Sequence, residues 1–289
     1  MATPPSFSVH RGARDLLLLA FDARWLGIEC DDTDGNRATA ERPETGREVM
    51  ARMPNVVAVL GGPMFSPEDS SDYARYQRAR LLYRYLDRRR NITVPTRHPE
   101  RGATLSVDSV GRVTVLDGAR EADGAIWAVQ GYPEVLREGR IEASDRADTN
   151  VTGRAALCAL SDGRVAFAIA RCGMADFGRV LVALRMEGDT RVRDAIYTDG
   201  GGSTCLALRG TGGELVVAHG LDARRLPAYL TAEPPASGPG MILTPNARGW
   251  IDAVRGSPWV RVVGGVLAAS ALTAGLLSFF EEDEEVRPW

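Results

Sequence analysis

The chain has 289 residues, of which 44% are hydrophobic and 25% charged, and its net charge is -3. All 35 residues in the lysine-plus-arginine count are arginine, because the sequence contains no lysine. This absence excludes Schiff-base catalysis and the lysine of a phosphate-binding P-loop. The near-neutral charge argues against nucleic acid as a partner, and the length is ample for a hydrophobic core.

Short apolar runs bounded by turn residues dominate the first 245 residues and predict a strand-rich domain. Several runs are joined by short Asp-Gly, Gly-Arg or Gly-Gly turns, which favour hairpins. The predicted strands span residues 16–21, 25–29, 56–60, 104–107, 113–116, 125–130, 154–160, 165–170, 195–198, 204–208 and 214–219.

Two stretches have the apolar periodicity of helices. Residues 73–90 place apolar side chains among arginines, which predicts a helix with a basic outer face. Residues 173–186 place Met174, Phe177 and Leu181 on one side of a second helix. Helices among hairpin strands predict an α+β fold with a mixed, largely antiparallel sheet and packed helices.

The C-terminal part differs from this domain, which we expect to span residues 1–233. Residues 234–258 are rich in proline and glycine and predict a linker. No charged residue occurs in the 19 residues from 262 to 280, which at about 1.5 Å each nearly cross a hydrocarbon core of roughly 30 Å. Residues 259–281 therefore predict a transmembrane helix, with an acidic tail over 282–289.

This interpretation makes the protein a single-pass membrane protein with a C-terminal anchor. The alternative is a buried amphipathic helix, because the stretch is rich in small residues and only moderately apolar. Arg255 and Arg261 precede the stretch, which favours a cytoplasmic domain with the acidic tail outside. Acidic residues count little in this rule, so the side of the membrane stays open.

The four cysteines and three histidines suggest no metal or cofactor site. Cys30, Cys158, Cys172 and Cys205 lie far apart and form no C-x-x-C pair, so small buried side chains are the default interpretation. The histidines are scattered along the chain. We therefore predict no cofactor and no metal.

The sharpest local feature is the segment Asp199-Gly200-Gly201-Gly202-Ser203-Thr204, which lies between two apolar strands. Three successive glycines are costly in conformational entropy unless the backbone needs unusual dihedral angles or a close approach to a ligand. The backbone amides of such a loop bind an anion without lysine, and the adjoining carboxylate and hydroxyl add polar groups. The alternative is a tight structural loop in which the aspartate only forms a turn.

The order strand–DGGGST–strand resembles the signature of the phosphodiester glycosidase family. Residues 59–65, with Gly61 and Gly62, resemble the family's strand that ends in Asn-Gly-Gly and an aromatic residue. Further similar segments lie at 128–139, 152–154 and 225–227, and the resemblance covers residues 14–233. Two positions depart from it, because Leu60 and Tyr197 stand where the family has asparagine.

The resemblance implies hydrolysis of the bond between a sugar C1 and a phosphodiester oxygen. It implies catalytic roles for Asp199 as the carboxylate, Arg154 as a phosphate-pairing fork and Ser203 as a hydroxyl in the phosphate cradle. The implied substrate-binding residues are Gly200, Gly201, Gly202, Thr204, Gly61, Gly62 and Tyr197. A second carboxylate stays open among Asp162, Asp176 and Glu134.

Two other functions stay open. The first is a membrane-anchored protein on the same scaffold that binds a sugar or phospho-sugar without cleaving it, which Leu60 motivates because leucine offers no polar contact. The second is partner docking through the basic face of residues 73–90. The expected partners are a carbohydrate or phospho-sugar and, through the C-terminal segment, a membrane.

Overall fold

The computed structural model describes residues 7–30, 39–40, 43–67, 79–142, 150–210, 213 and 215–234. Within these residues the strands form four sheets, and every described strand pair within a sheet is antiparallel. The predicted largely antiparallel sheet structure is therefore confirmed, and the described helices are few. No parallel pair occurs among the described strands, so the expected mixed sheet is not seen there.

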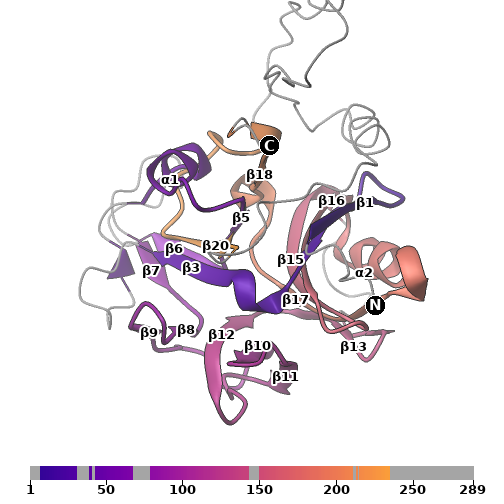
Figure 1. The fold of residues 1–289 in the computed structure, drawn as a ribbon, viewed down its shortest axis with the longest axis horizontal. Helices are drawn as coiled ribbons and strands as arrows, with labels where there is room; N and C mark the ends of the chain where they lie inside the picture. The colour runs from indigo at the N-terminus through magenta and orange to yellow at the C-terminus, as the bar shows by residue number, and fades with distance from the viewer. Residues whose placement is uncertain are drawn as a thin grey trace, which may run out of the picture.

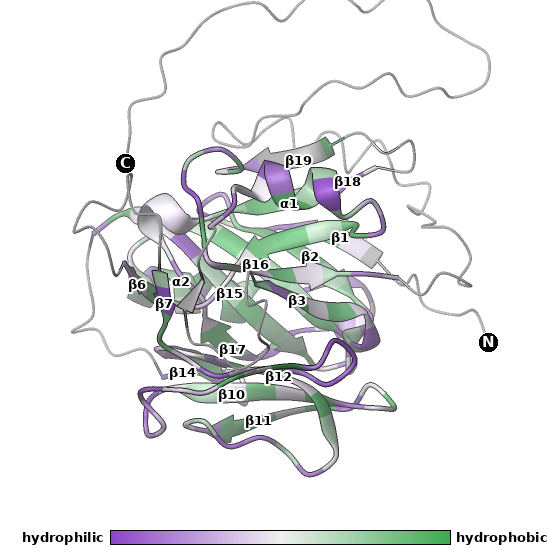
Figure 2. Cartoon of the chain, turned by 90° about the vertical axis from the view of Figure 1, so that its left-hand side faces the viewer, coloured by the Kyte–Doolittle hydropathy of each residue, from purple (hydrophilic) through white to green (hydrophobic). Residues whose placement is uncertain are grey.

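The largest sheet is buried on both faces. In β15 the side chains of Ala155 and Leu157 enter the main core, whereas Ala156 and Cys158 point to the other face. That other face is covered by helix α2 (Met174–Ala183), and the sheet strands are largely apolar (Figures 1 and 2). Burial on both faces explains their nearly continuous apolar sequence. The strand order is β1 (Phe7–Arg11), β2 (Leu17–Phe21), β16 (Val165–Cys172), β15 (Thr152–Leu160), β17 (Val192–Tyr197), β13 (Glu134–Arg137) and β14 (Arg140–Ile141).

Three smaller sheets enclose the main core from the other sides. Phe167 of the largest sheet, Tyr85 of the second and Tyr229 of the third all belong to one buried cluster. The second sheet has the order β11 (Val113–Asp117), β10 (Ala103–Asp108), β12 (Ala125–Gly131), β8 (Tyr85–Asp87) and β9 (Ile92–Val94). The third has the order β19 (Leu215–His219), β18 (Leu206–Arg209), β5 (Ala58–Gly61), β20 (Ala228–Ala232) and β3 (Leu26–Cys30). The fourth has the order β4 (Thr39–Ala40), β7 (Ala79–Leu81) and β6 (Phe65–Pro67).

The predicted helix over 173–186 is confirmed as α2. Helix α1 (Gly46–Arg52) was not predicted, although Thr45 and Glu48 form a capping box at its start, a signal readable in the sequence. Three short 3-10 turns complete the described helical elements. They are η1 (Ala23–Trp25), η2 (Glu187–Asp189) and η3 (Gly201–Ser203).

The predicted helix over 73–90 is wrong where the structure describes it. Residues 79–90 contain the strands β7 and β8, and residues 73–78 lie outside the described residues. The buried side chains alternate, because Leu81, Tyr83 and Tyr85 are buried while residues 80, 82 and 84 are partly exposed. Burial of every second side chain is typical of a strand, and in a stretch this short the apolar residues can also fit the spacing of a helix.

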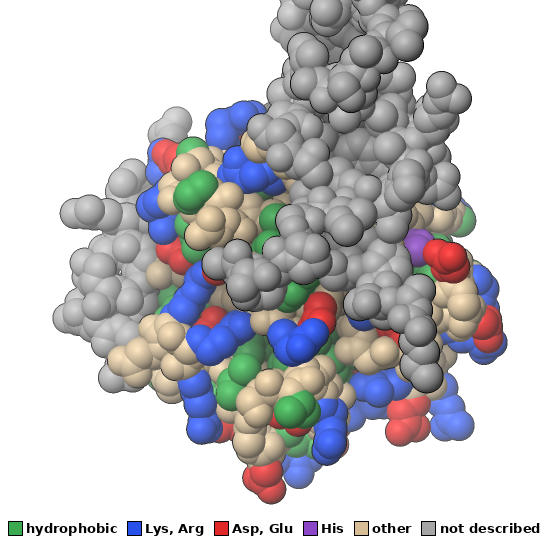
Figure 3. All heavy atoms as spheres, viewed as in Figure 1, with side chains coloured by type: hydrophobic (Ala, Val, Ile, Leu, Met, Phe, Trp, Pro, Cys, Tyr) green, Lys and Arg blue, Asp and Glu red, His purple; other side chains and the backbone are tan. Residues whose placement is uncertain are grey.

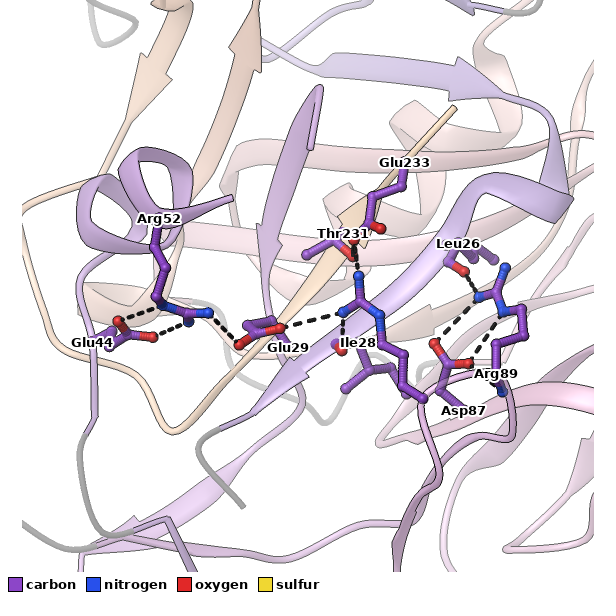
Figure 4. A network of polar contacts seen from close by, with 10 residues as sticks. Leu26, Ile28, Glu29, Glu44, Arg52, Asp87, Arg89, Thr231 and Glu233 are labelled. Atoms are coloured by element: carbon purple, nitrogen blue, oxygen red, sulfur yellow. Dashed lines mark hydrogen bonds and ion pairs between the residues drawn. The ribbon is translucent and has the colours of Figure 1, made fainter. Parts of the chain in front are cut away.

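Two arginines of this stretch attach it to the edge strand β3. Arg89 donates a hydrogen bond to the carbonyl of Leu26 (Figure 4). Arg90 donates one of 2.6 Å to the carbonyl of Ile28. β3 is the last strand of its sheet, so carbonyls on its outer side have no neighbouring strand. The guanidinium groups therefore satisfy edge carbonyls and join the β8–β9 turn to β3.

The same arginines pair with acids, so they do not form the basic docking face that the sequence suggested. Arg89 pairs with the buried Asp87, and Arg90 pairs with Glu29 and Glu233. Figure 3 shows the same arrangement more widely, with arginine and acidic side chains interspersed over the visible face. The hypothesis of docking through this face loses its basis within residues 79–90.

The predicted C-terminal elements follow Pro234, the last described residue. The transmembrane helix over 259–281, the acidic tail and all of the linker after Pro234 lie outside the described residues. Among the residues that are described, no helix has the length and apolarity needed to cross a bilayer. The membrane anchor and the domain boundaries stay predictions.

The Arg90 contacts predict a measurable contribution to stability. Replacing Arg90 by Met leaves Glu233 and the Ile28 carbonyl without their guanidinium partner, so we expect the free energy of unfolding to fall by about 1–3 kcal/mol. The matched control is Arg120→Met, because Arg120 is 70% exposed and pairs with Asp117, which is 77% exposed. That change is expected to stay within about 0.5 kcal/mol in chemical denaturation. Equal losses in both variants would contradict the edge-strand interpretation.

Candidate active site

The glycine-rich loop lies where several strand ends meet. It follows β17, passes through η3 and enters β18. A Cβ atom on Gly153, at the start of β15, would lie 2.4 Å from Oγ1 of Thr204. One on Gly61, at the end of β5, would lie 2.7 Å from the carbonyl oxygen of Ser203. No side chain fits at either position, so glycine allows both strands to contact the loop directly.

Two glycines of the loop have their own packing reasons. A Cβ atom on Gly200 would lie 1.8 Å from the Tyr197 hydroxyl, which is packed against the loop. A Cβ atom on Gly202 would lie 2.8 Å from Nη2 of Arg224. Tyr197 itself is only 6% exposed and packs with the α2 side of the sheet, so it supports the loop from within.

Asp199 is partly exposed at the end of β17. Its Oδ1 accepts a hydrogen bond of 2.8 Å from the backbone N–H of Gly200. Burial raises its pKa to about 6, against the opposing effects of hydrogen bonds from Ser203 and Gly200 and the charge of Arg224. A carboxyl group with a pKa near neutrality that solvent can still reach is suited to proton transfer.

Arg224 is a residue of this site that the sequence analysis missed. Its Nη1 donates a hydrogen bond of 3.0 Å to Oγ of Ser203, which is buried beside Asp199. The neighbouring Arg225 points elsewhere, because it donates to the Pro43 carbonyl and to Glu48. Nothing in the sequence separates these two adjacent arginines, since the fold of the β19–β20 connection decides which one faces the loop.

The structure places the guanidinium of Arg154 at the ends of β15 and β16. It donates hydrogen bonds of 3.1 Å to the carbonyl of Cys172 and 3.0 Å to that of Asn150. The side chain is 4% exposed. Arg154 follows Gly153, which contacts the loop in space, but the described hydrogen bonds of the Arg154 guanidinium go to backbone carbonyls.

The other predicted substrate contacts lie at or beside the loop. Thr204 is 2% exposed, and its Oγ1 has no hydrogen-bond partner among the described residues. A Cβ atom on Gly62 would lie 2.7 Å from the Ala228 carbonyl oxygen and 2.9 Å from the Tyr85 hydroxyl. Leu60 is fully buried in the main core, opposite Leu206 in β18, so it offers the site no polar contact.

The three candidates for a second carboxylate are separated by the fold. Asp162 lies in the turn beyond Leu160, at the end of β15 opposite to Gly153, which is roughly 25 Å away at strand spacing. This distance excludes it from the site. Asp176 pairs with Arg179 on α2, and Glu134 lies opposite Ile196 in β17 and pairs with Arg137. Burial raises the pKa of Glu134.

Within the described part of the chain, no group of three or more His, Cys, Asp or Glu side chains is placed to hold a metal ion. The four cysteines are free thiols, and three of them are buried. Burial raises the pKa of the Cys172 thiol to about 11, which makes it a poor nucleophile at neutral pH.

The comparison with protein families decides which family this site belongs to. The phosphodiester glycosidase family model matches residues 54–231, which is more than half of the chain. The chain belongs to the phosphodiester glycosidase family. The matched residues include the end of β5, the whole DGGGST loop and Arg224, so the resemblance predicted from the sequence is confirmed.

Solved structures agree at the level of the fold. The chain is similar to the catalytic domain of zebrafish N-acetylglucosamine-1-phosphodiester alpha-N-acetylglucosaminidase, a structure auto-inhibited by its pro-peptide. The TM-score is 0.59, and the sequences are 15% identical over 81% of this chain and 86% of that one. A structure from Burkholderia pseudomallei K96243 has a TM-score of 0.53 and 13% identity over 76% and 74% of the two chains. No curated protein sequence matches the chain.

The raised pKa of Asp199 predicts that this residue costs stability. Its pKa in the folded protein, about 6, lies above the ordinary value of 3.8, so ionisation disfavours the folded state. The resulting loss of folding stability begins near the ordinary pKa of 3.8 and is complete above about pH 6. We expect Asp199→Asn to be more stable than the parent at pH 7.5, by an amount on the order of 1–2 kcal/mol after screening. This advantage should shrink as the pH falls toward 4 in thermal unfolding.

Asp22→Asn is the control with the opposite sign. The hydrogen bond from the Arg24 side chain lowers the pKa of Asp22, so its ionised form stabilises the folded state. The variant should be less stable than the parent at pH 7.5, and the deficit should begin to shrink near pH 4, the ordinary pKa of aspartate. The deficit is lost as the pH falls further, through the lowered pKa of Asp22 in the folded protein. An Asp199→Asn variant that follows the Asp22→Asn trend would contradict the pKa assignment.

Proposed function

We propose that this protein hydrolyses a sugar-1-phosphodiester at the bond between the sugar C1 and the phosphodiester oxygen. The observation that carries the proposal is a partly exposed carboxylate, Asp199, on a glycine loop beside the Arg224–Ser203 hydrogen bond. The membership in the phosphodiester glycosidase family supports a hydrolase of this kind.

In the proposed reaction, the electron pair of the C1–O bond leaves with the phosphate oxygen while a water oxygen bonds to C1. Asp199 in its ionised form accepts the proton of this water. The leaving phosphate is a weak base, so it needs less help from a general acid than an ordinary glycoside does. The positive charge that develops at the sugar is also stabilised by the same carboxylate.

The negative phosphate is assigned to the other side of the loop. The Arg224 guanidinium supplies a positive charge and a planar set of donors, which suit a phosphate group. Its bond to Ser203 orients the serine hydroxyl, which in turn hydrogen-bonds to Asp199. A carboxylate and an arginine linked through one serine therefore divide the two charges of the transition state between them.

The first test is hydrolysis of the methyl phosphodiester of N-acetylglucosamine 1-phosphate, with the glucose and mannose analogues alongside. We expect Asp199→Asn to lower kcat by about 10²–10⁴-fold, because the variant lacks a proton acceptor. The kcat/KM of the parent should rise with pH through about 6, where Asp199 ionises. Asp162→Asn, at the far end of β15, is the control and should retain activity. Equal turnover by Asp199→Asn and the parent would exclude the mechanism.

Three arginine variants test the phosphate contact. We expect Arg224→Gln to lower kcat/KM by about 10–100-fold, which corresponds to about 1.5–3 kcal/mol for a hydrogen bond to a charged group. Arg225→Gln is the matched control, because its contacts with Pro43 and Glu48 lie outside the loop. Arg154→Gln tests the phosphate role predicted from the sequence. A loss that is larger in Arg154→Gln than in Arg224→Gln, without a loss of stability, would assign the phosphate to Arg154 instead.

A second candidate function is binding of the same ligands without hydrolysis. It is favoured by Leu60, whose burial in the core removes a polar contact that the family pattern leads one to expect. The two functions differ in one product, because hydrolysis releases free sugar. Saturable binding of the phosphodiester with no free sugar would select the binding function.

A further inference from the structure

Buried hydroxyl groups without partners gather around the Asp199 loop. The Tyr85 hydroxyl and the Oγ1 atoms of Thr198 and Thr204 are buried, and none has a hydrogen-bond partner among the described residues. Thr198 and Thr204 lie at the two ends of the loop. A buried polar group without a partner costs stability, so such groups call for a ligand or a bound water.

Tyr85 reaches this site from a different sheet. It lies in β8 opposite Val129 of β12, and its ring is fully buried in the main core. Its hydroxyl lies against Gly62, where a Cβ atom would be only 2.9 Å away. The absence of a side chain at Gly62 is therefore what lets the hydroxyl reach the end of β5.

The Tyr85 hydroxyl lies at Gly62, next to Gly61, whose N–H donates a hydrogen bond of 2.9 Å to the Cys205 carbonyl at the end of the loop, and it makes no direct hydrogen bond to Asp199. Burial raises the pKa of Tyr85 well above its ordinary value, and the charges of Cys30 and Asp199 add to this effect. The hydroxyl thus stays protonated and serves as a fixed donor. Ionised Asp199 is only an acceptor.

A ligand group that hydrogen-bonds to both residues has to accept from the tyrosine and donate to the carboxylate. A hydroxyl group does both. A phosphate oxygen is an acceptor, so it suits Tyr85 but is repelled by Asp199. The chemistry therefore favours a sugar hydroxyl at Tyr85 and leaves the phosphate to Arg224.

We propose that Tyr85 is a substrate-contacting residue that recognises a sugar hydroxyl, which it binds together with Asp199. This inference rests on the proposed function, because it takes the ligand to be a phospho-sugar. It adds a specificity contact from β8 to a site otherwise built from the β17–β18 loop and the β19–β20 connection.

The experiment compares Tyr85→Phe with Tyr229→Phe in the full chain. Tyr229 is a matched control, because it is also buried in the main core but its hydroxyl donates a 2.8 Å hydrogen bond to the Glu44 carbonyl. Binding of N-acetylglucosamine 1-phosphate, glucose 1-phosphate, mannose 1-phosphate and inorganic phosphate is measured by calorimetry. Thermal unfolding and hydrolysis of the methyl phosphodiesters are measured on the same samples.

We expect Tyr85→Phe to bind at least one sugar phosphate about 3–10-fold more weakly than the parent, as for the loss of one hydrogen bond. Its affinity for inorganic phosphate should not change, and its Tm should be equal or higher because an unpaired buried hydroxyl is removed. Tyr229→Phe should show the reverse, a lower Tm with unchanged binding.

The outcomes separate this inference from the proposed function. Hydrolysis by the parent with unchanged sugar-phosphate binding by Tyr85→Phe overturns the Tyr85 contact and leaves the function in place. Weaker sugar-phosphate binding by Tyr85→Phe, without hydrolysis by the parent, supports the Tyr85 contact and overturns the proposed hydrolysis. If Tyr85→Phe weakens the binding of inorganic phosphate equally, the hydroxyl is assigned to the phosphate, and the inference is overturned. If Tyr85→Phe has a lower Tm with unchanged binding, the hydroxyl is assigned to a structural water, and the inference is again overturned. A parent that neither binds nor hydrolyses any of these probes overturns both.

Discussion

The site depends on one steric constraint, which is that strand ends from different sheets contact the same loop without side chains between them. Gly61 and Gly153 bring the end of β5 and the start of β15 against the residues that follow Asp199. Gly200 leaves room for the Tyr197 hydroxyl beneath the loop. Since any Cβ atom at these three positions would overlap its neighbours, the close contacts that glycine allows fix the backbone of the loop and with it the position of the Asp199 carboxylate.

The electrostatics of the site follow from this close packing. Contact from several strands removes solvent around Asp199 and raises its pKa, whereas the Gly200 N–H, the Ser203 hydroxyl and the Arg224 charge favour its ionised form. The balance leaves a carboxyl group that titrates near neutrality. Such a group is suited to proton transfer, and it is less stable as an ion than an exposed aspartate, so function and stability oppose each other at this position.

A lysine-free chain uses the arginine fork for several different purposes. Arg89 and Arg90 donate to carbonyls of the edge strand β3, and Arg154 donates to carbonyls at the ends of β15 and β16. Arg224 instead contacts a side chain of the loop, Ser203. The planar guanidinium with several donors allows both uses, and only the partners that surround it distinguish a structural arginine from one that faces a ligand.

Sequence patterns were reliable where burial is regular. The strands around 154–160 and 165–170 are continuous apolar runs because α2 and the main core cover both faces of their sheet, and the helix over 173–186 has a clear apolar side. The stretch 79–90 was misassigned, because arginines between buried residues in a short strand resemble the spacing of an amphipathic helix. Arg224 and Tyr85 were missed, because each reaches the loop from an element distant in the chain.

The sequence by itself determined the family and the DGGGST loop, because both depend on a local run of residues whose order and chemistry are visible without coordinates. It also determined most strands of the largest sheet, since apolar periodicity reports burial directly. Only the tertiary structure decided which arginine faces the loop, how strongly Asp199 is desolvated and where the Tyr85 hydroxyl lies. These properties depend on distances between segments far apart in the chain, and such distances arise only when the sheets pack around their common core.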